Sequence, residues 1–346
     1  MNREKLSPAQ WGALLWAAAL APASELLPGV ALELAGRGAW LSPLAALIFL
    51  LPLFWLGRRG DVTALRKSWA GRAVLVLCVL WMELLVVLRL GLCARRMLWS
   101  GERDGAVWYF LLTLAAIALW IGQGKLSAFG RAGQLFLVML MGAAVLVLGL
   151  SLPRLRADRV LPLWTQDAVP VLLSGVSAAG SIGWAVLPLL LLPVQERKGK
   201  TLVLWGVGGG VLLTLAQLII IGNLGVGLCA QSDSAFFALT KSVGVEGAFQ
   251  RVESIVAAVW VFSDLLLLTG ILWCIRRIGG VLCPRVPAPT LVTIAALSAM
   301  VTALALFGER VSPRALERIL LPLGSLVLGL TIPGLAILMR GRKRER

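Results

Sequence analysis

The first apolar segment of the chain begins at about Gln10 and contains at its centre the stretch Ala17-Ala18-Ala19-Leu20-Ala21-Pro22-Ala23-Ser24-Glu25-Leu26-Leu27-Pro28-Gly29. Proline lacks the amide hydrogen that a helix uses and clashes with the preceding turn, so the two prolines predict an interruption. Backbone groups freed inside a membrane must find partners within the protein or in a water-lined cavity. We therefore expect a helix over about 10–35 that is broken near 21–24.

A second interrupted segment follows about 160 residues later, where another apolar run contains Ser177-Ala178-Ala179-Gly180-Ser181-Ile182-Gly183. Interrupted segments in corresponding positions of two halves are the best sequence pointer to the binding site of a transporter-like protein. A single cluster of small residues would more simply serve close packing of membrane helices. Because two clusters open the two halves, we interpret the pair as a binding site.

The composition is that of a membrane protein. Of the 346 residues, 59% are hydrophobic and 14% are charged, whereas soluble domains carry about 25% charged residues. Apolar runs of about 20 residues, enough to cross a hydrocarbon core of ~30 Å, recur along the whole chain. Too little polar surface remains to cover a soluble protein. The sequence predicts an all-α, multi-pass membrane protein that contacts the lipid bilayer and forms one domain over 1–346.

We expect ten transmembrane helices. Their approximate ranges are 10–35, 39–57, 73–99, 105–122, 129–152, 167–193, 202–228, 252–275, 287–307 and 317–339. The first and sixth are the discontinuous ones, the sixth being broken near 178–183. Five spans in each half invert the second half relative to the first, which is the 5+5 inverted repeat of LeuT-like transporters. The expected repeats cover about 10–152 and about 167–340.

Charge distribution supports the count of ten. The two termini and the loops after the second, fourth, sixth and eighth spans, together with Arg131 at the start of the fifth span, hold 20 of the 33 Lys and Arg residues but only four of the 17 Asp and Glu residues. The whole net charge of +16 therefore lies on one side. Because Lys and Arg mark the cytoplasmic face, we expect both the N and C termini in the cytoplasm. The basic clusters are short loops that suit anionic headgroups, so we expect no nucleic-acid partner.

The N-terminus has one alternative interpretation. Arg3 and Lys5 precede an apolar stretch that ends in the small residues Ala21-Pro22-Ala23, a pattern that resembles a signal peptide with its cleavage site. Removal of such a peptide would leave nine spans and spoil the alternation of charge.

Enzymatic and metal chemistry have little support in the sequence. The chain has no histidine, which excludes histidine bases and histidine-ligated zinc or haem. Its five cysteines show no C-x-x-C spacing and are typical of small apolar residues in helices. We find no nucleophile–base pair and no metal cluster, so we expect no catalytic residue, no metal and no cofactor.

Several short motifs occur in a fixed order along the chain. Span one ends in Glu25-Leu26-Leu27-Pro28, and Gly38-Ala39-Trp40-Leu41-Ser42 opens span two. Leu161-Pro162-Leu163 precedes span six and Leu192-Pro193 ends it. The most specific motif is Phe249-Gln250-Arg251-Val252-Glu253-Ser254, followed by Ala258-Val259-Trp260. Over about 6–342, this order resembles the spore germination permease family, the B subunits of nutrient germinant receptors, within the amino acid–polyamine–organocation superfamily.

The resemblance implies a function in spore germination. A family member would bind a small nutrient, such as an amino acid, in the inner membrane of an endospore or the cell membrane. It would signal to an A-type membrane subunit and a C-type lipoprotein. The alternative is a secondary active amino-acid transporter coupled to protons or sodium, because both proteins need the same pocket.

Two departures from the family pattern bear on this choice. The family often has glycines at the first break, where Ala21-Pro22-Ala23 stand here. Many members carry an acidic residue after the second break, whereas Gly183-Trp184-Ala185 contains none. The missing acid favours sensing over transport, and the indole predicts a smaller or differently shaped pocket.

The two breaks supply most of the expected ligand-binding residues. A half-helix exposes amides at one end and carbonyls at the other, which suit the carboxylate and the ammonium of an amino acid. Two tryptophans are expected to wall the side-chain pocket. The expected residues are Ala21, Pro22, Ala23, Ser24, Ser177, Ala178, Gly180, Ser181, Gly183, Trp184 and Trp260.

Three intramembrane carboxylates are candidates for binding or coupling, because charges inside a bilayer are costly and functional by default. Glu25 lies in the first break, Glu83 in the middle of span three and Asp264 in span eight. Each is expected to bind the ligand ammonium, a proton or a coupling cation; the structural alternative is an internal ion pair. Arg89 is six residues from Glu83 and therefore on a different helix face. We expect any partner of Glu83 on another span.

Overall fold

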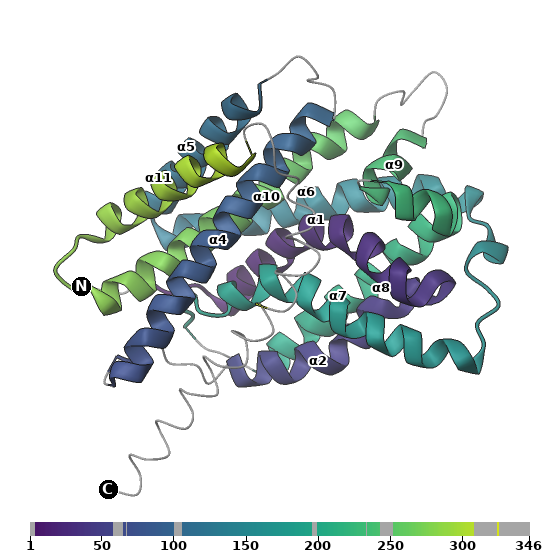
Figure 1. Cartoon of the computed structure of the whole chain (residues 1–346), viewed down its shortest axis with the longest axis horizontal. Coiled ribbons are helices and arrows are strands. Elements are labelled where there is room, and N and C mark those ends of the chain that lie inside the picture. The colour runs from purple at the N-terminus through teal and green to yellow at the C-terminus, as the bar shows by residue number, and fades with distance from the viewer. Residues whose placement is uncertain are drawn as a thin grey trace, which may run out of the picture.

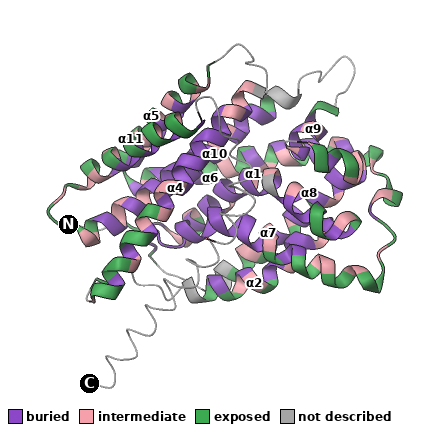
Figure 2. Cartoon of the chain, in the orientation of Figure 1, coloured by how far each residue is buried: buried purple, intermediate pink, exposed green. Residues whose placement is uncertain are grey.

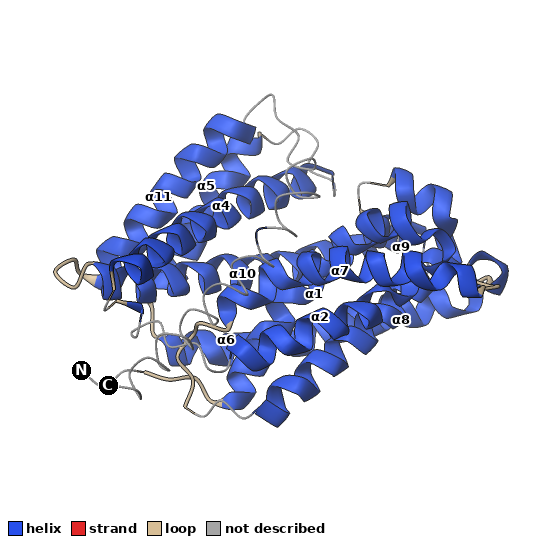
Figure 3. Ribbon diagram, turned by 60° about the horizontal axis from the view of Figure 1, so that its bottom comes forward, coloured by secondary structure: helices blue, strands red, loops and turns tan. Residues whose placement is uncertain are grey.

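The computed structural model describes residues 4–57, 65, 66, 68–99, 106–195, 199–232, 234–242, 252–307 and 324. The regular secondary structure of these residues is entirely helical (Figure 1, Figure 3). They are α1 (Pro8–Ala35), α2 (Ser42–Gly57), α4 (Trp69–Trp99), α5 (Val107–Gln123), α6 (Leu126–Ser151), α7 (Ala168–Leu189), α8 (Gly199–Gln231), α9 (Ala235–Ser242), α10 (Val252–Leu282) and α11 (Ala288–Phe307). Short 3₁₀ turns are η1 (Gly36–Leu41), η2 (Leu152–Arg154), η3 (Ala157–Arg159) and η4 (Thr165–Asp167).

The helices form two groups that meet at α1 and α10. One group contains α1, α2, α7 and α8, and the other contains α4, α5, α10 and α11 (Figure 1). Helix α6 packs against both α1 and α10. Any side chain that joins α1 to α4 or α10 therefore bridges the two groups.

Nine of the ten expected spans each contain one long helix, namely α1, α2, α4, α5, α6, α7, α8, α10 and α11. The tenth, 317–339, lies outside the described residues except for Gly324. Seven described stretches are long and apolar enough to cross a membrane, and α5 is a shorter apolar helix. Large apolar side chains such as those of Ile48, Trp120 and Leu204 are exposed, as expected for contact with lipid. Figure 2 shows exposed residues, in green, along α2, α5 and α11. The chain is a multi-pass membrane protein.

Helices α1 and α7 pack against each other in opposite directions. Near the start of α1, the Trp11 indole N–H donates to the carbonyl of Leu189 at the end of α7, with an Nε1–O distance of 3.0 Å. The segment before α1 continues this contact, because the amide of Leu6 donates to the carbonyl of Pro193 and the amide of Gln195 donates to the carbonyl of Leu6, each at 2.9 Å. The N-terminal end of α1 is thus fixed to the C-terminal end of α7.

The expected breaks near 21–24 and 178–183 are wrong. Helix α1 runs unbroken from Pro8 to Ala35 with both prolines inside it, and α7 runs unbroken from Ala168 to Leu189. A proline removes only one amide donor, and a neighbouring helix can compensate. Pro22 cannot donate to the carbonyl of Ala18, and the Ser263 hydroxyl of α10 donates to the adjacent carbonyl, that of Ala17, at 2.5 Å. Packing of α1 against α7, α8 and α10 then holds the helix across the proline.

The backbone interruption that the described helices do contain is in α8. Gly225 has a φ of 79°, which an L side chain rarely adopts. The connection between α6 and α7 covers this point: the amide of Arg156 donates to the carbonyl of Gly222 at 3.1 Å, and the Arg159 guanidinium donates to the carbonyl of Asn223. On the same exposed connection, the Arg156 guanidinium lies 3.0 Å from Asp158 and lowers the pKa of that carboxyl.

Close approach of α2 to α7 depends on Gly175, which provides a test of the packing. A Cβ atom at Gly175 would lie 2.6 Å from the Cβ of Ala45 and 3.0 Å from its carbonyl carbon. Because a backbone atom cannot turn aside, we expect Gly175→Ala to destabilise the protein by about 1–3 kcal/mol. Thermal unfolding of the purified protein in detergent measures this as a lower Tm.

The matched control is Gly142→Ala, since a Cβ at Gly142 meets nothing within 4 Å. The Tm of this variant should equal or exceed that of the native protein, because alanine is more favourable than glycine in a helix by about 1 kcal/mol. Equal Tm values for the two variants would contradict the packing described for α2 and α7.

Candidate functional site

Four charged side chains from three helices meet in the interior: Glu25 of α1, Arg89 and Arg96 of α4, and Asp264 of α10. We call them the charge cluster. The Glu25 Oε2 atom lies 3.2 Å from Arg89 Nη1 and 3.0 Å from Arg96 Nη1. Arg89 Nε donates to Asp264 Oδ1 at 2.8 Å, and Arg96 forms an ion pair with Asp264 Oδ2. Each carboxylate therefore pairs with both arginines.

Helix geometry explains how one helix supplies both cations. Arg89 and Arg96 are seven residues apart, which is two turns of α4 and places them on one face. Their side chains are 0% and 5% exposed, and those of Asp264 and Glu25 are 0% and 12% exposed. Charges this deeply buried require partners. Two cations and two anions balance, so the cluster adds no net charge to the membrane interior.

Aromatic rings cover both arginines. The Arg89 guanidinium lies 5.8 Å from the centre of the Trp184 ring of α7, and that of Arg96 lies 6.0 Å from the Phe237 ring of α9. Trp260 of α10 stacks on Phe236 of α9 with ring centres 4.5 Å apart, and Phe237 meets it edge-on. Helix α9 is therefore attached to the cluster through Phe237 and to α10 through Trp260.

The indole N–H of Trp184, beside the cluster, makes no hydrogen bond to the described residues, although Trp184 is fully buried. An unpaired buried donor costs about 1–3 kcal/mol. A bound molecule with an acceptor at this point would relieve that cost.

The structure brings some of the predicted residues together and separates others. Glu25, Asp264 and Trp184 lie in or against the cluster, and Trp260 reaches it through α9. Glu83 lies elsewhere, between α4 and α11, where it accepts a hydrogen bond from the Ser298 hydroxyl. This partner is on another span, but it is a hydroxyl and not the cation of an ion pair. For Glu25 and Asp264 the structure shows internal ion pairs.

The residues of the two expected breaks are parts of regular helices. Pro22, Ala23 and Ser24 are buried in α1, whereas the side chain of Ala21 lies outside the described residues. In α7, Ala178, Gly180, Ser181 and Gly183 are buried and Ser177 is half-buried. The Ser181 hydroxyl donates to the Ser177 carbonyl at 2.9 Å, within its own helix. These residues pack around the interior without the open half-helix ends that we expected.

Sequence reasoning missed the two arginines as site residues. The spacing to Glu83 excludes Arg89 as its partner and gives no role to Arg89 or Arg96. The available signal was their two-turn spacing inside an otherwise apolar helix, since intramembrane arginines are as costly as carboxylates. Chemically, the cluster offers two guanidinium forks, which bind a carboxylate bidentately, and two carboxylates, which bind an ammonium. In the described part of the chain, no three His, Cys, Asp or Glu residues are grouped to hold a metal ion.

One comparison with known proteins gives the family and another gives the fold. Residues 103–307 match the family described as Spore germination protein. The crystal structure of MhsT in complex with L-phenylalanine matches with a TM-score of 0.68 and 14% sequence identity, covering 94% of this chain and 89% of that one. The fold is therefore LeuT-like. A search of curated proteins finds no significant match.

The cluster predicts a characteristic pattern of thermodynamic coupling. Removing one member of a buried ion pair leaves an uncompensated charge and costs about 3–5 kcal/mol. We expect Glu25→Gln and Arg96→Gln each to lower Tm strongly. The double variant, which removes one anion and one cation, should lose much less than the sum of the two. Thermal unfolding in lipid nanodiscs provides the measurement.

Additive losses in the double variant would show that Glu25 and Arg96 do not interact. Glu83→Gln is the control, because Glu83 is also an intramembrane carboxylate but lies outside the cluster. Its combination with Arg96→Gln should be additive.

Proposed function

The chain belongs to the spore germination protein family, and we propose that it is the nutrient-binding B subunit of an endospore germinant receptor. In this proposal it binds a small amino acid among α1, α4, α7 and α10 and signals to partner subunits. We place the two expected repeats, about 10–152 and about 167–340, in one transmembrane domain; residues 308–323 and 325–340 of the second repeat lie outside the described residues. The antiparallel packing of α1 and α7 supports an inverted relation between the repeats.

The balanced charge of the cluster carries this proposal. A zwitterionic amino acid has one carboxylate and one ammonium. It can take the place of one internal ion pair, with its carboxylate on Arg89 or Arg96 and its ammonium on Glu25 or Asp264. Every buried charge then keeps a partner, which an anionic or cationic ligand would not allow. The buried, unpartnered indole N–H of Trp184 adds a donor beside this position.

The class of ligand has support from the comparison of folds. The matching MhsT structure is a complex with L-phenylalanine, an amino acid. In the present chain, Ser24 of α1 and the small residues of α7 lie on the two helices that flank the cluster. These helices would define the space left for the ligand side chain.

The position of the cluster suggests how binding is converted into a signal. The ion pairs join α1 to α4 and α10, and hence one helix group to the other. A ligand that replaces one pair changes the link between the groups and favours one arrangement of them. Phe237 on Arg96 passes the change to α9. With both termini in the cytoplasm, α9 is external, where an A-type subunit and a C-type lipoprotein would be contacted.

A secondary active transporter is the second candidate. Glu25 and Asp264 are buried carboxylates that a proton or sodium ion would neutralise, and transport needs such a coupling site. Uptake of amino acids by proteoliposomes, with and without a proton or sodium gradient, separates the two functions. Gradient-driven accumulation would establish transport, whereas binding without accumulation supports sensing.

Germination of spores tests the proposed receptor. In a strain whose other germinant receptors are deleted, spores are exposed to a panel of amino acids, sugars and nucleosides. Deletion of this chain should abolish the response to an amino acid. We expect Asp264→Asn, which removes an ammonium partner, and Arg89→Lys, which keeps charge but loses the bidentate fork, to raise the half-maximal concentration at least tenfold.

Glu83→Gln serves as the control and should germinate normally. Membranes of each strain are assayed for protein level, so that poor folding is recognised. If both cluster variants accumulate normally and respond like the native strain, the cluster is not the nutrient site. If deletion changes no response, the chain is not the receptor for those nutrients.

A further inference from the structure

Helix α9 covers the charge cluster near one end of the helix bundle. The cluster lies towards this end, because Arg96 is only three residues before Trp99, the last residue of α4. Phe237 of α9 lies over the Arg96 guanidinium, and its neighbour Phe236 stacks on Trp260 of α10. Both phenylalanines are buried. A molecule that approaches the cluster from this end must therefore pass α9.

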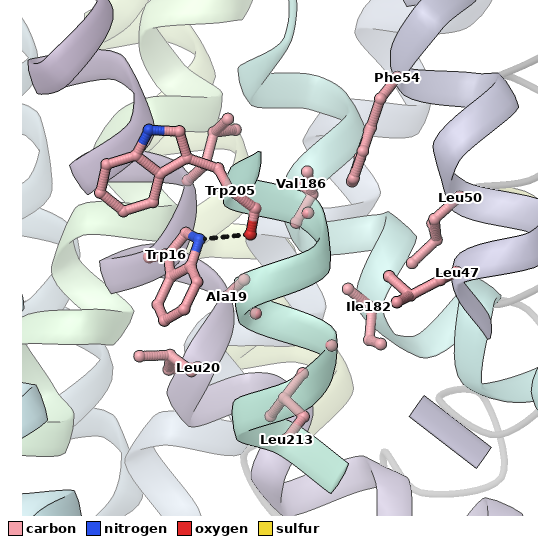
Figure 4. A pocket seen from close by; sticks show the side chains of 14 residues that line it. Trp16, Ala19, Leu20, Leu47, Leu50, Phe54, Ile182, Val186, Trp205 and Leu213 are labelled. Carbon is pink, nitrogen blue, oxygen red and sulfur yellow. Dashed lines mark hydrogen bonds between the residues drawn. The ribbon is translucent and has the colours of Figure 1, made fainter. Parts of the chain in front are cut away.

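The apolar recess shown in Figure 4 does not lead to the cluster. It is lined by residues of α1, α2, α7 and α8, and the described residues that line it include no member of the cluster or of α9. The Trp16 indole N–H donates to the carbonyl of Trp205 beside this recess, at 2.8 Å. The recess and the cluster are thus separate features of the molecule.

The segment between α6 and α7, residues 152–167, holds the C-terminal end of α9. We call this segment the α6–α7 connection. The Arg154 guanidinium donates to the carbonyl of Ser242, the last residue of α9. Carbonyls in the last turn of a helix have no amide partner within the helix, and a cation there also complements the helix dipole. Arg154 therefore fixes α9 at its end.

The same connection is attached to the kink of α8, the helix that precedes α9. In a regular helix the carbonyls of Gly222 and Asn223 accept from amides four residues later, which here lie beyond the kink at Gly225. The Gly222 carbonyl instead accepts from the amide of Arg156 at 3.1 Å, and the Asn223 carbonyl accepts from the Arg159 guanidinium. The connection thus supplies donors where α8 turns before α9.

We propose that Arg154 and Arg159 are positioning residues that hold α9 over the charge cluster, and that α9 opens when they release their carbonyls. Arg154 is exposed and Arg159 is half-buried, so water can replace the carbonyls at a small net cost. Release frees the end of α9 and the turn before it, and Phe237 then leaves Arg96. The inference rests on the proposed function only in taking the cluster as the nutrient site.

Arg156 provides a matched control on the same connection. Its guanidinium lies 3.0 Å from Asp158, which also belongs to the connection, and both side chains are more than half exposed. The contact of Arg156 with α8 is made by its backbone amide, which a change of side chain leaves in place. Arg156→Ala therefore removes the same charge as Arg154→Ala without removing a bond to α8 or α9.

The thiol of Cys93 reports whether α9 is open. It is fully buried and lies 3.6 Å from Arg96 Nη2, the arginine that Phe237 covers. In a full-length variant whose other four cysteines are alanine, this thiol is labelled in lipid nanodiscs with the charged reagent sulfonatoethyl methanethiosulfonate. Mass spectrometry gives the labelling rate in the absence of nutrient.

We expect Arg154→Ala and Arg159→Ala each to raise the labelling rate of Cys93 about tenfold, because each removes a hydrogen bond from a charged donor. Arg154→Lys, which can still donate to the carbonyl, should restore most of the slow rate. Arg156→Ala should label at the native rate.

A variant with Cys78 as its single cysteine separates opening of α9 from loosening of the whole bundle. Cys78 is buried in α4, roughly 27 Å along the helix from Arg96. Its labelling rate should stay the same in all three alanine variants.

Three results would overturn the proposal. The first is a native Cys93 rate in both Arg154→Ala and Arg159→Ala. The second is an equal rise at Cys78, which would make the two arginines general stabilisers of the bundle. The third is an equal rise in Arg156→Ala, which would make the charge of the connection decisive and not the two bonds.

The proposed function is tested separately by adding amino acids to the native single-cysteine protein. Protection of Cys93 by one of them supports the nutrient site at the cluster. If none protects Cys93 while the arginine variants behave as predicted, the role of the two arginines stands and the proposed nutrient site does not.

Discussion

The structure depends on the mutual neutralisation of four charges in the membrane interior. Arg89 and Arg96 come from one helix, and Glu25 and Asp264 reach them from α1 and α10. Any one of these charges, placed alone in hydrocarbon, would carry a large free-energy cost. Together they join the two helix groups at the point where α1 meets α10. A site of this kind is both a structural link and a place where a ligand of matching charges can compete.

Close packing provides the second constraint. Glycine and alanine let α2, α7 and α8 approach one another to distances at which a single added Cβ would collide, as at Gly175 and Gly210. The same packing keeps α1 helical across Pro22, with Ser263 of α10 bonded to the turn before it. Small residues thus explain the close contacts among these helices.

Local sequence predicted the family, the membrane class and nine helix positions, because hydrophobic runs and ordered motifs are properties of contiguous residues. It also selected Glu25 and Asp264 on the cost of burying charge. It could not pair them with Arg89 and Arg96, since residues 25, 89, 96 and 264 meet only in the folded chain. The break near 21–24 was wrong because the proline rule omits neighbouring helices, and the break near 178–183 was wrong because the small residues there are packed inside a regular helix. The interruption at Gly225 was missed because one glycine in an apolar, glycine-rich helix gives no distinct signal.

The central claim is that the cluster recognises an amino acid by both of its charges. Competition against a radiolabelled amino acid bound to the purified protein tests it most directly, using the N-acetyl derivative, which lacks the ammonium, and the amide derivative, which lacks the carboxylate. The account predicts that each derivative competes at least a hundredfold more weakly than the parent amino acid, since each leaves a buried charge unpaired. A derivative that competes as well as its parent would contradict the account.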